Sequence, residues 1–405
     1  MKYKLSDMCD YAKGKIDVAE LDENTYISTE NMVPNRGGIN RASSLPTVVQ
    51  TQSFSAGDIL VSNIRPYFKK IWFAEYDGGC SNDVLVFRAK DGVYSRFLYY
   101  VLSDDSFFEY SMATSKGTKM PRGDKVAIMK YEVPKFTYEE QKIIADLLEA
   151  LDKRIQLNTK INDNLLQQAK TLFKSWFVDF DPFDEPMIEA PTGFQVPSSL
   201  KMVQIQDLPH ILETGKRPKG GAVSEGIPSV GAENVKELGV FDSSSAKYIP
   251  IEFAQTMKKG KIEGYELLMY KDGGKPGTFT PHFSMFGEGF PYEEFYINEH
   301  VFKLDFEDRG YNEFAYLYMQ TDYPYHWLAN NGGKAAIPGI NQQNVNEIWI
   351  YHPSHPRVQE FCKWVQPLFT TIFTNCAQNM KLAKLRDALL PKLMSGELDV
   401  SDIDI

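Results

Sequence analysis

The chain has 405 residues, enough for two or three domains that each bury a core. Its composition, 43% hydrophobic and 24% charged, is that of a globular protein, and no apolar run reaches the roughly 18–20 residues of a membrane-spanning helix. The net charge of −10 excludes a chain that is basic throughout, and four scattered cysteines argue against a disulfide framework and a cysteine zinc site, so we expect a cytoplasmic protein.

Residues 1–137 are expected to form a mixed domain of short strands with a helix near Ser95–Phe108. The segment Gly57–Val61 is strand-like, with three consecutive β-favouring or apolar residues at its end. The segment Lys116–Arg122 is basic and contains a glycine, as surface loops often do.

A long helix is predicted over residues 138–177, because Tyr138 to Trp176 contains neither glycine nor proline. Thr137 and Glu140 form a capping-box pattern at its start. A rise of 1.5 Å per residue would make this helix about 55–60 Å long. One face carries an apolar stripe that two asparagines interrupt, namely Leu148, Leu151, Ile155, Asn158, Asn162, Leu165, Ala169, Leu172 and Trp176.

Residues 178–200 are expected to be a linker with several prolines and aspartates, and residues 201–353 to repeat the first domain. Short matches recur in the same order in both halves. Their separation grows from 200 between Asp7 and Asp207 to 217 between Pro121 and Pro338. Such growth is expected if two related domains carry different loop insertions, so the sequence predicts a pseudo-two-fold internal repeat.

A second long helix is predicted over residues 354–395, followed by a tail at 396–405. Shifting the first stripe by 217 positions gives a second stripe, namely Val365, Leu368, Ile372, Asn375, Asn379, Leu382, Arg386, Leu389 and Leu393. Both stripes break at two asparagines, and Arg386 alone is discordant. Two unrelated amphipathic helices would seldom reproduce this pattern.

The four asparagines are expected to fix the register of a helix pair, because an unpaired amide inside an apolar seam is destabilising. An antiparallel pair brings Asn158 opposite Asn379 and Asn162 opposite Asn375. This arrangement satisfies all four amides at once. The sequence therefore predicts antiparallel, coiled-coil packing.

No catalytic constellation stands out in the sequence. Asp181-Pro-Phe183 lacks the second proline of an adenine methyltransferase motif, and Gly273–Thr278 lacks the spacing of a phosphate-binding loop. His352 and His355 are three residues apart, but prolines beside them break the helix that a metal pair would use. We expect a non-catalytic chain without a metal site.

Three segments resemble the specificity subunits of type I restriction–modification systems. The run Leu172–Asp181 is similar to the end of that family's central conserved region, and Leu382–Glu397 to its C-terminal conserved region. Pro134 with Glu140–Ala145 resembles the start of the family's first helix. The second helix departs at its start, where Arg357-Val-Gln359 replaces the Glu-Gln-Lys core.

The resemblance implies an α+β fold in which two mixed target-recognition domains are separated by a pair of long antiparallel helices. Each domain would read one half of an asymmetric bipartite target in double-stranded DNA, and the helices would set the spacer. The implied partners are two methyltransferase subunits, which use S-adenosylmethionine to methylate adenine, and restriction subunits, which use ATP and Mg²⁺. No cofactor is expected in this chain. Because the net charge is negative, we expect weak DNA binding without the partners.

Candidate DNA-binding residues are side chains in loops that suit base edges or phosphates. In the first domain they are Asn31, Arg36, Asn40, Arg41, Asn63, Arg65, Tyr67, Lys69, Lys116, Thr118, Lys119 and Arg122. In the second domain they are Lys216, Arg217, Lys219, Asn234, Lys271, Lys275, Thr278, Asn330, Asn331, Lys334 and Asn341. The loops Lys116–Arg122 and Asn330–Asn341 are favoured because they are basic, contain glycine and recur in both halves.

Phe173, Trp176 and Phe177 crowd the end of the first helix, and two interpretations stay open. They form a partner interface, or they pack against the linker of their own chain. For the whole protein, the alternatives to DNA recognition are a stand-alone methyltransferase or nuclease with an unfamiliar site, and a coiled-coil scaffold that does not bind DNA.

Overall fold

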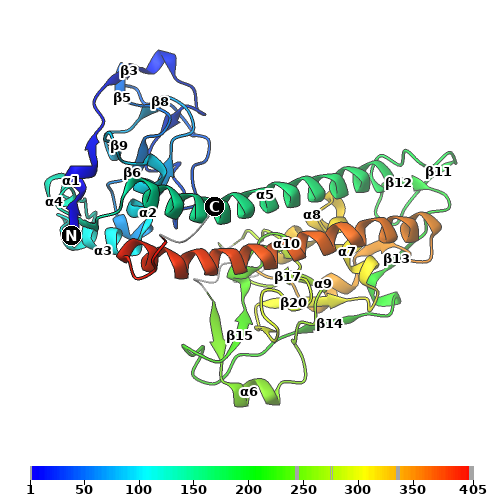
Figure 1. Ribbon diagram of the computed structural model, residues 1–405. Helices are drawn as coiled ribbons and strands as arrows, with labels where there is room; N and C mark the ends of the chain where they lie inside the picture. Colours follow the sequence, from blue (N-terminus) through cyan, green and yellow to red (C-terminus); the bar gives the residue numbers. More distant parts are fainter. Residues whose placement is uncertain (1, 242–245, 274, 276, 334–337, 401–405) are drawn as a thin grey trace. The chain divides into compact units, whose positions relative to one another are not determined.

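The computed structural model describes residues 2–241, 246–273, 275, 277–333 and 338–400 (Figure 1). Two 40-residue helices dominate it, α5 (Tyr138–Phe177) and α10 (Pro356–Ser395). The chain divides into two compact units, and both helices run through each of them. Unit 1 contains the residues up to Arg154 together with those from Lys381 on, and unit 2 contains Ile155–Met380. None of the described helices is long and apolar enough to cross a membrane.

Unit 1 contains two four-stranded sheets. One is antiparallel and has the order β2 (Cys9–Tyr11), β9 (Val84–Ala89), β6 (Ile59–Ser62), β7 (Ile71–Phe73). The other has the order β3 (Lys15–Asp17), β5 (Gln50–Phe54), β8 (Gly78–Cys80), β4 (Tyr26–Ile27), with β4 parallel to β8. The remaining elements are the strand pair β1 (Lys2–Lys4) and β10 (Glu132–Pro134), the helices α1 (Leu5–Met8), α2 (Ser95–Ser103), α3 (Asp105–Ala113) and α4 (Lys125–Ile128), and the 3₁₀ turns η1 (Val18–Glu20) and η2 (Pro66–Phe68).

Unit 2 repeats this plan. Its antiparallel sheet has the order β14 (Ile211–Thr214), β20 (Val301–Asp305), β17 (Leu267–Tyr270), β18 (Phe283–Ser284). A second sheet has the order β16 (Lys247–Ile249), β15 (Ile227–Val230), β19 (Tyr296–Ile297), with β19 parallel to β15. The remaining elements are the pairs β11 (Met187–Glu189) with β12 (Gln195–Pro197) and β13 (Met202–Gln204) with β21 (Trp349–Tyr351), the helices α6 (Ile251–Thr256), α7 (Arg309–Tyr318), α8 (Asp322–Gly332) and α9 (Gln342–Asn346), and the 3₁₀ turns η3 (Ile205–Asp207) and η4 (Ala232–Asn234).

The internal repeat is visible in the strand register. Tyr3 pairs with Val133 in unit 1, and Val203 pairs with Ile350 in unit 2, so the counterparts are 200 and 217 residues apart, as the sequence predicted. The fold is therefore α+β, with two similar mixed domains and a pair of long antiparallel helices.

Two predicted segments differ in detail. The helix expected near Ser95–Phe108 is two helices, α2 and α3, because Asp104 between them is extended and its carboxylate accepts a hydrogen bond from Ser106 N at 2.9 Å. The linker at 178–200 contains the hairpin β11–β12, in which Ile188 pairs with Val196.

The helix pair is antiparallel within unit 2, and the predicted asparagine contacts are confirmed. Asn158 Nδ2 donates to Asn379 Oδ1 at 2.8 Å and to Gln378 Oε1 at 2.7 Å. Asn375 Nδ2 donates to Asn162 Oδ1 at 2.8 Å. Because Asn158 is only 1% exposed, its hydrogen bonds lie inside the helix pair and fix the register of α5 against α10.

Arg386, the discordant member of the second stripe, also has a partner in the helix pair. Within unit 1 its Nη1 donates to Asp152 Oδ1 on α5 at 2.8 Å. The other carboxylate oxygen of Asp152 accepts a hydrogen bond from the Tyr100 hydroxyl at 2.8 Å. The apolar stripe is therefore interrupted by a matched pair of charges.

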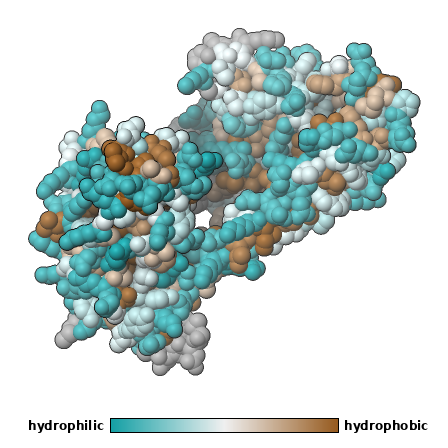
Figure 2. Space-filling model, turned by 90° about the horizontal axis from the view of Figure 1, so that it is seen from above, coloured by the Kyte–Doolittle hydropathy of each residue, from teal (hydrophilic) through white to brown (hydrophobic). Residues whose placement is uncertain are grey.

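Each unit has its own hydrophobic core, and each core includes one half of the helix pair. In unit 1, Leu148 of α5 and Leu393 of α10 belong to the same buried cluster as Phe97 of α2. This is why the compact units differ from the predicted domains at 1–137 and 201–353, which excluded the helices. The face drawn in Figure 2 is mostly hydrophilic, with hydrophobic residues gathered in separate patches.

The aromatic residues at the end of α5 belong to the core of unit 2. Phe173 and Phe177 are 3% and 2% exposed, and both rings contact Phe314 and Phe361. They are buried by their own chain, so the predicted partner interface is corrected for these two residues. Trp176 is half-buried, and the Arg357 guanidinium lies 5.7 Å from the centre of its ring.

Glu313 on α7 is a buried acid in the core of unit 2. Its Oε1 accepts a hydrogen bond from Arg309 Nε at 3.3 Å, while Oε2 has no hydrogen-bond partner in the described part of the chain. Burial raises the pKa of Glu313 to about 8, although the Arg309 charge opposes the shift. The folded protein therefore keeps a proton that the unfolded chain releases near pH 4.5.

Glu313→Gln should therefore stabilise the protein increasingly as the pH rises. A raised acid pKa lowers the free energy of unfolding as the pH climbs from the unfolded value toward the folded one, because the folded state binds more protons. We expect the variant to gain on the order of 2 kcal/mol over the wild type near pH 8 and little near pH 4. Thermal denaturation across this range measures the difference, with the exposed Glu360→Gln as the control. A difference that does not grow with pH would contradict the assignment.

Candidate nucleic-acid interface

The predicted DNA-binding loops of unit 1 are bound to one another through their backbones. Arg65 N donates to Pro121 O at 2.8 Å, and Gly123 N donates to Asn63 O at 3.2 Å. These bonds join the loop after β6 to the predicted loop Lys116–Arg122. In the loop after β6, Lys69 O also accepts a hydrogen bond from Arg36 N at 2.9 Å. Three segments that are far apart in the sequence therefore form one surface.

Unit 2 reproduces this pairing of loops. Gly273 N donates to Pro338 O at 2.8 Å, and Ile340 N donates to Lys271 O at 2.8 Å. These bonds are the counterparts of those between Arg65 and Pro121 and between Gly123 and Asn63. The predicted residue Lys334 lies outside the described residues. Both units therefore carry the same pair of loops beside their antiparallel sheets.

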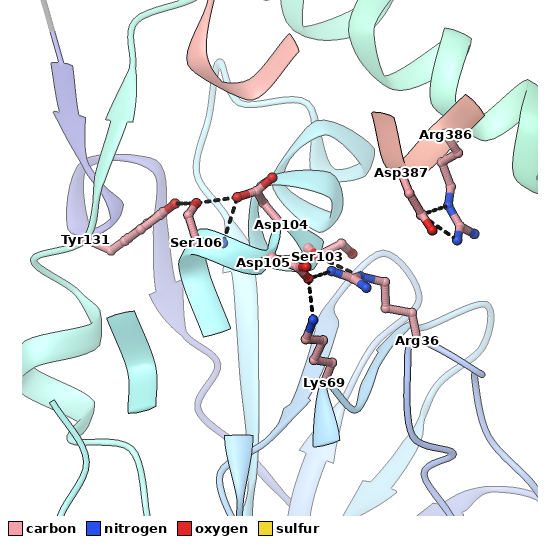
Figure 3. Close-up of polar contacts among 9 residues, drawn as sticks. All are labelled: Arg36, Lys69, Ser103, Asp104, Asp105, Ser106, Tyr131, Arg386 and Asp387. Atoms are coloured by element: carbon pink, nitrogen blue, oxygen red, sulfur yellow. Dashed lines mark hydrogen bonds and ion pairs between the residues drawn. The ribbon is translucent and has the colours of Figure 1, made fainter. Parts of the chain in front are cut away.

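Most of the predicted cations in these loops are already in ion pairs. Arg36 and Lys69 approach Asp105 from two different loops (Figure 3), the Lys69 pair measuring 2.8 Å. Burial would raise the pKa of Asp105, but hydrogen bonds from Lys69 and Arg36 hold that pKa below its ordinary value. The other pairs are Lys116 with Asp124 at 2.6 Å, Arg122 with Asp83 at 3.1 Å, Arg41 with Glu23 at 2.7 Å, Lys271 with Asp272 at 3.7 Å and Arg217 with Glu299 at 3.8 Å.

These ion pairs lie at the surface and are weak in water. Lys116, for example, is 82% exposed. A phosphate can therefore replace the exposed carboxylate partners at small cost. This arrangement agrees with the negative charge of the whole chain.

Several predicted asparagines hold the loops together and do not point outward. Asn31 is 7% exposed, and its Nδ2 donates to Tyr26 O and Asn40 O. Asn63 and Asn234 are also buried, and Asn234 Oδ1 accepts from Gly231 N. These contacts give the side chains of Asn31 and Asn234 a structural role, whereas Asn63 Oδ1 is buried without a hydrogen-bond partner in the described part of the chain.

Arg65 is half-buried, and its Nε has no hydrogen-bond partner among the described residues. The other predicted side chains divide into partnered and exposed groups. Asn331 Nδ2 donates to Trp327 O, Asn341 Oδ1 caps α9 by accepting from Asn344 N, and Lys271 Nζ donates to Glu299 O. The exposed group consists of Asn40, Tyr67, Thr118, Lys119, Lys216, Lys219, Lys275, Thr278 and Asn330.

The structure also reveals a polar groove in unit 1 that the sequence analysis did not propose. It encloses about 480 Å³, and its lining includes Lys13, Lys15, Gln52, Asn82 and Lys125. The repeat contains a signal for this groove, because Gly14-Lys15 aligns with Gly215-Lys216. Lys216 is among the predicted DNA-binding residues, and Lys15 is not. A second polar cavity of about 440 Å³ in the same unit includes Asn40 and Arg41.

The described residues contain no group of three or more histidine, cysteine, aspartate or glutamate side chains that could hold a metal ion. Burial raises the pKa of the Cys9 and Cys80 thiols to about 12, so neither is an activated nucleophile.

Comparison with known proteins points in the same direction. Residues 1–167 match the family described as the type I restriction modification DNA specificity domain. The chain is 28% identical over 323 residues to the type I restriction enzyme MjaIX specificity subunit of Methanocaldococcus jannaschii, which covers 78% of this chain and 71% of that one. It is 24% identical to the HindI specificity subunit of Haemophilus influenzae, over 98% of this chain and 99% of that one. The solved type I restriction-modification S subunit from M. genitalium has a similar fold, with a TM-score of 0.58 at 17% identity over 97% of this chain and 96% of that one.

Proposed function

Because the chain belongs to the specificity subunits of type I restriction–modification systems, we propose that each unit reads one half of a bipartite DNA target. The observation that supports this proposal is the loop pair that recurs in both units. Each pair presents cations and amides on a rigid sheet, and such groups contact phosphates and base edges. The chain itself recognises DNA, and the chemistry belongs to partner subunits.

The proposed partners follow from the internal symmetry. A pseudo-two-fold chain offers two similar surfaces, which suit two copies of one methyltransferase subunit. That subunit would bind S-adenosylmethionine and methylate adenine, and restriction subunits would supply ATP- and Mg²⁺-dependent cleavage in the cytoplasm. The helix pair would set the unread spacer between the half-sites, because its register is fixed by polar contacts.

The decisive experiment is modified-base sequencing of DNA from cells that carry the cognate methyltransferase, with and without this chain. We expect N6-methyladenine at one split, asymmetric motif only when the chain is present, because the loops of the two units differ in sequence. Unchanged methylation in cells where the two proteins demonstrably assemble would overturn the proposal.

Loop variants test the assignment of one half-site to each unit. Lys119→Ala with Arg122→Ala should relax specificity in one half of the motif only, and Lys275→Ala with Thr278→Ala in the other half. A lost base contact lowers discrimination about 5- to 150-fold, from roughly 1–3 kcal/mol. The matched control is Lys153→Ala, which removes an exposed lysine from α5 and should leave the motif unchanged. Relaxation of both halves by either variant would contradict the assignment.

A further inference from the structure

An exposed pair of aromatic rings projects from the loop after β6 in unit 1. Tyr67 and Phe68, here called the aromatic tip, are 48% and 36% exposed. Their ring centres are 4.7 Å apart at an interplanar angle of 51°. Two neighbouring aromatic side chains that remain this exposed are unlike core residues, and exposed apolar groups that lie together often mark a binding surface.

The backbone holds the aromatic tip in place. The residues on either side, Arg65 and Lys69, both have φ of 51°, in the left-handed region that side-chain-bearing residues rarely adopt. Between them Pro66 fixes its own φ, and Lys69 N donates to Pro66 O at 2.8 Å. Strained conformations of this kind persist only where the surroundings impose them, and they concentrate at functional sites.

Neighbouring loops supply those surroundings. Phe68 O accepts a hydrogen bond from Asn35 N at 2.8 Å, and Arg65 N donates to Pro121 O at 2.8 Å. Lys69 is tied to Asp105 at the start of α3, as Figure 3 shows. The tip is therefore anchored on both sides and cannot retreat into the core without breaking the shared surface of the three loops.

The charges around the aromatic tip identify the class of its partner. Four cations lie on or beside the loop, namely Arg36, Arg65, Lys69 and Lys70. Asp105 pairs with Arg36 and Lys69. Burial lowers the pKa of Lys70, and the nearby Glu30 carboxylate opposes that shift, so the positive charges outnumber these two carboxylates. Lys70 Nζ is 5.8 Å from the centre of the Phe68 ring. Rigid aromatic rings inside a cationic rim suit a polyanion whose interior is a stack of flat bases, which is duplex DNA.

We propose that Tyr67 and Phe68 form a wedge that inserts at one base step of the half-site read by unit 1 and partly unstacks it. The proposal rests on the proposed function and adds a mechanism of recognition. Unstacking costs less free energy at deformable base steps, so the DNA sequence at such a step would affect binding even where no loop residue contacts the bases. The corresponding loop of unit 2 lacks a wedge in its described residues. Its Phe279 is buried and stacked on Tyr270, with ring centres 5.6 Å apart. We therefore expect the deformation at the half-site that unit 1 reads.

The test uses the complex of the full chain with its methyltransferase subunit and a duplex that carries the motif found by sequencing. 2-Aminopurine is placed in turn at positions of both half-sites other than the methylated adenine, since its fluorescence rises when it unstacks. We expect a rise at one step of one half-site with the wild type. Tyr67→Ser with Phe68→Ser should abolish that rise and weaken binding about ten- to a hundredfold, while Phe68→Trp should retain it.

The matched control is Val48→Ser with Val49→Ser, which removes a similarly exposed apolar pair from another loop of unit 1 and should leave both readouts unchanged. No fluorescence rise at any position with a wild-type complex that methylates its motif would overturn the wedge and leave the proposed function intact. Loss of methyltransferase assembly in the Tyr67/Phe68 variant would also overturn it, because the tip would then be a protein interface. If the wild-type chain directs no methylation, both the proposed function and the wedge are wrong.

Discussion

Replacing Phe177 with alanine should lower the free energy of unfolding of unit 2 by about 3–5 kcal/mol, because it empties a fully buried site. The ring is 2% exposed and lies 4.9 Å from Phe314, 5.4 Å from Phe361 and 5.9 Å from Tyr351, centre to centre. Its carbonyl oxygen accepts the hydroxyl of Tyr351 at 3.2 Å. The substitution therefore leaves a cavity where α5, α7 and α10 meet inside the unit.

Urea denaturation of wild type and variant measures this loss, and Trp176→Ala is the matched control. Trp176 precedes Phe177 on the same turn but is only half-buried, so its removal should cost less than half as much. Binding of the methyltransferase subunit is measured below the unfolding transition. If Phe177→Ala kept full stability and lost only that binding, the partner-interface interpretation would be restored.

The repeat and the helix pair could be predicted because both leave a one-dimensional pattern. The helical period alone is enough to recognise two apolar stripes that are interrupted by asparagines at the same positions. The Asn158–Asn379 and Asn162–Asn375 contacts then follow from the requirement that buried amides be paired. Neither inference depends on how the domains fold.

The candidate interface could be predicted only as a set of loops. An asparagine that binds backbone carbonyls, such as Asn31, and one that faces solvent, such as Asn40, have the same sequence signature. Burial of Phe173 likewise depends on residues far along the chain, in α7 and α10. Lys15 has the same sequence signal as the predicted Lys216, because Gly14-Lys15 and Gly215-Lys216 occupy equivalent places in the repeat.

Arg386 shows how a departure from pattern can carry information about structure. In the second stripe it replaces the apolar residue expected from Ala169, and the sequence alone offers no partner for it. The structure supplies Asp152, with both side chains 21% exposed, together with Asp387 on α10. Burial opposes the charge of Arg386, and the hydrogen bond and charge of Asp152 outweigh it, so that the pKa of the guanidinium is raised.

A double-mutant cycle on Asp152 and Arg386 should therefore reveal strong coupling. Arg386→Leu alone should destabilise unit 1 by about 2–4 kcal/mol, because Asp152 stays half-buried with only the Tyr100 hydroxyl as a partner. Asp152→Leu alone should destabilise it less, because Arg386 keeps Asp387 as a charged partner. The double variant should recover most of the loss, since two leucines continue the apolar stripe that the ion pair interrupts.

Chemical denaturation of the four proteins gives the coupling energy, about 2 kcal/mol or more if the pair acts as a unit. Additive losses would mean that each charge acts through other neighbours. A recovered double variant that still assembles but methylates a motif with an altered spacer would instead show that this pair, like the asparagines, fixes the register of the two helices.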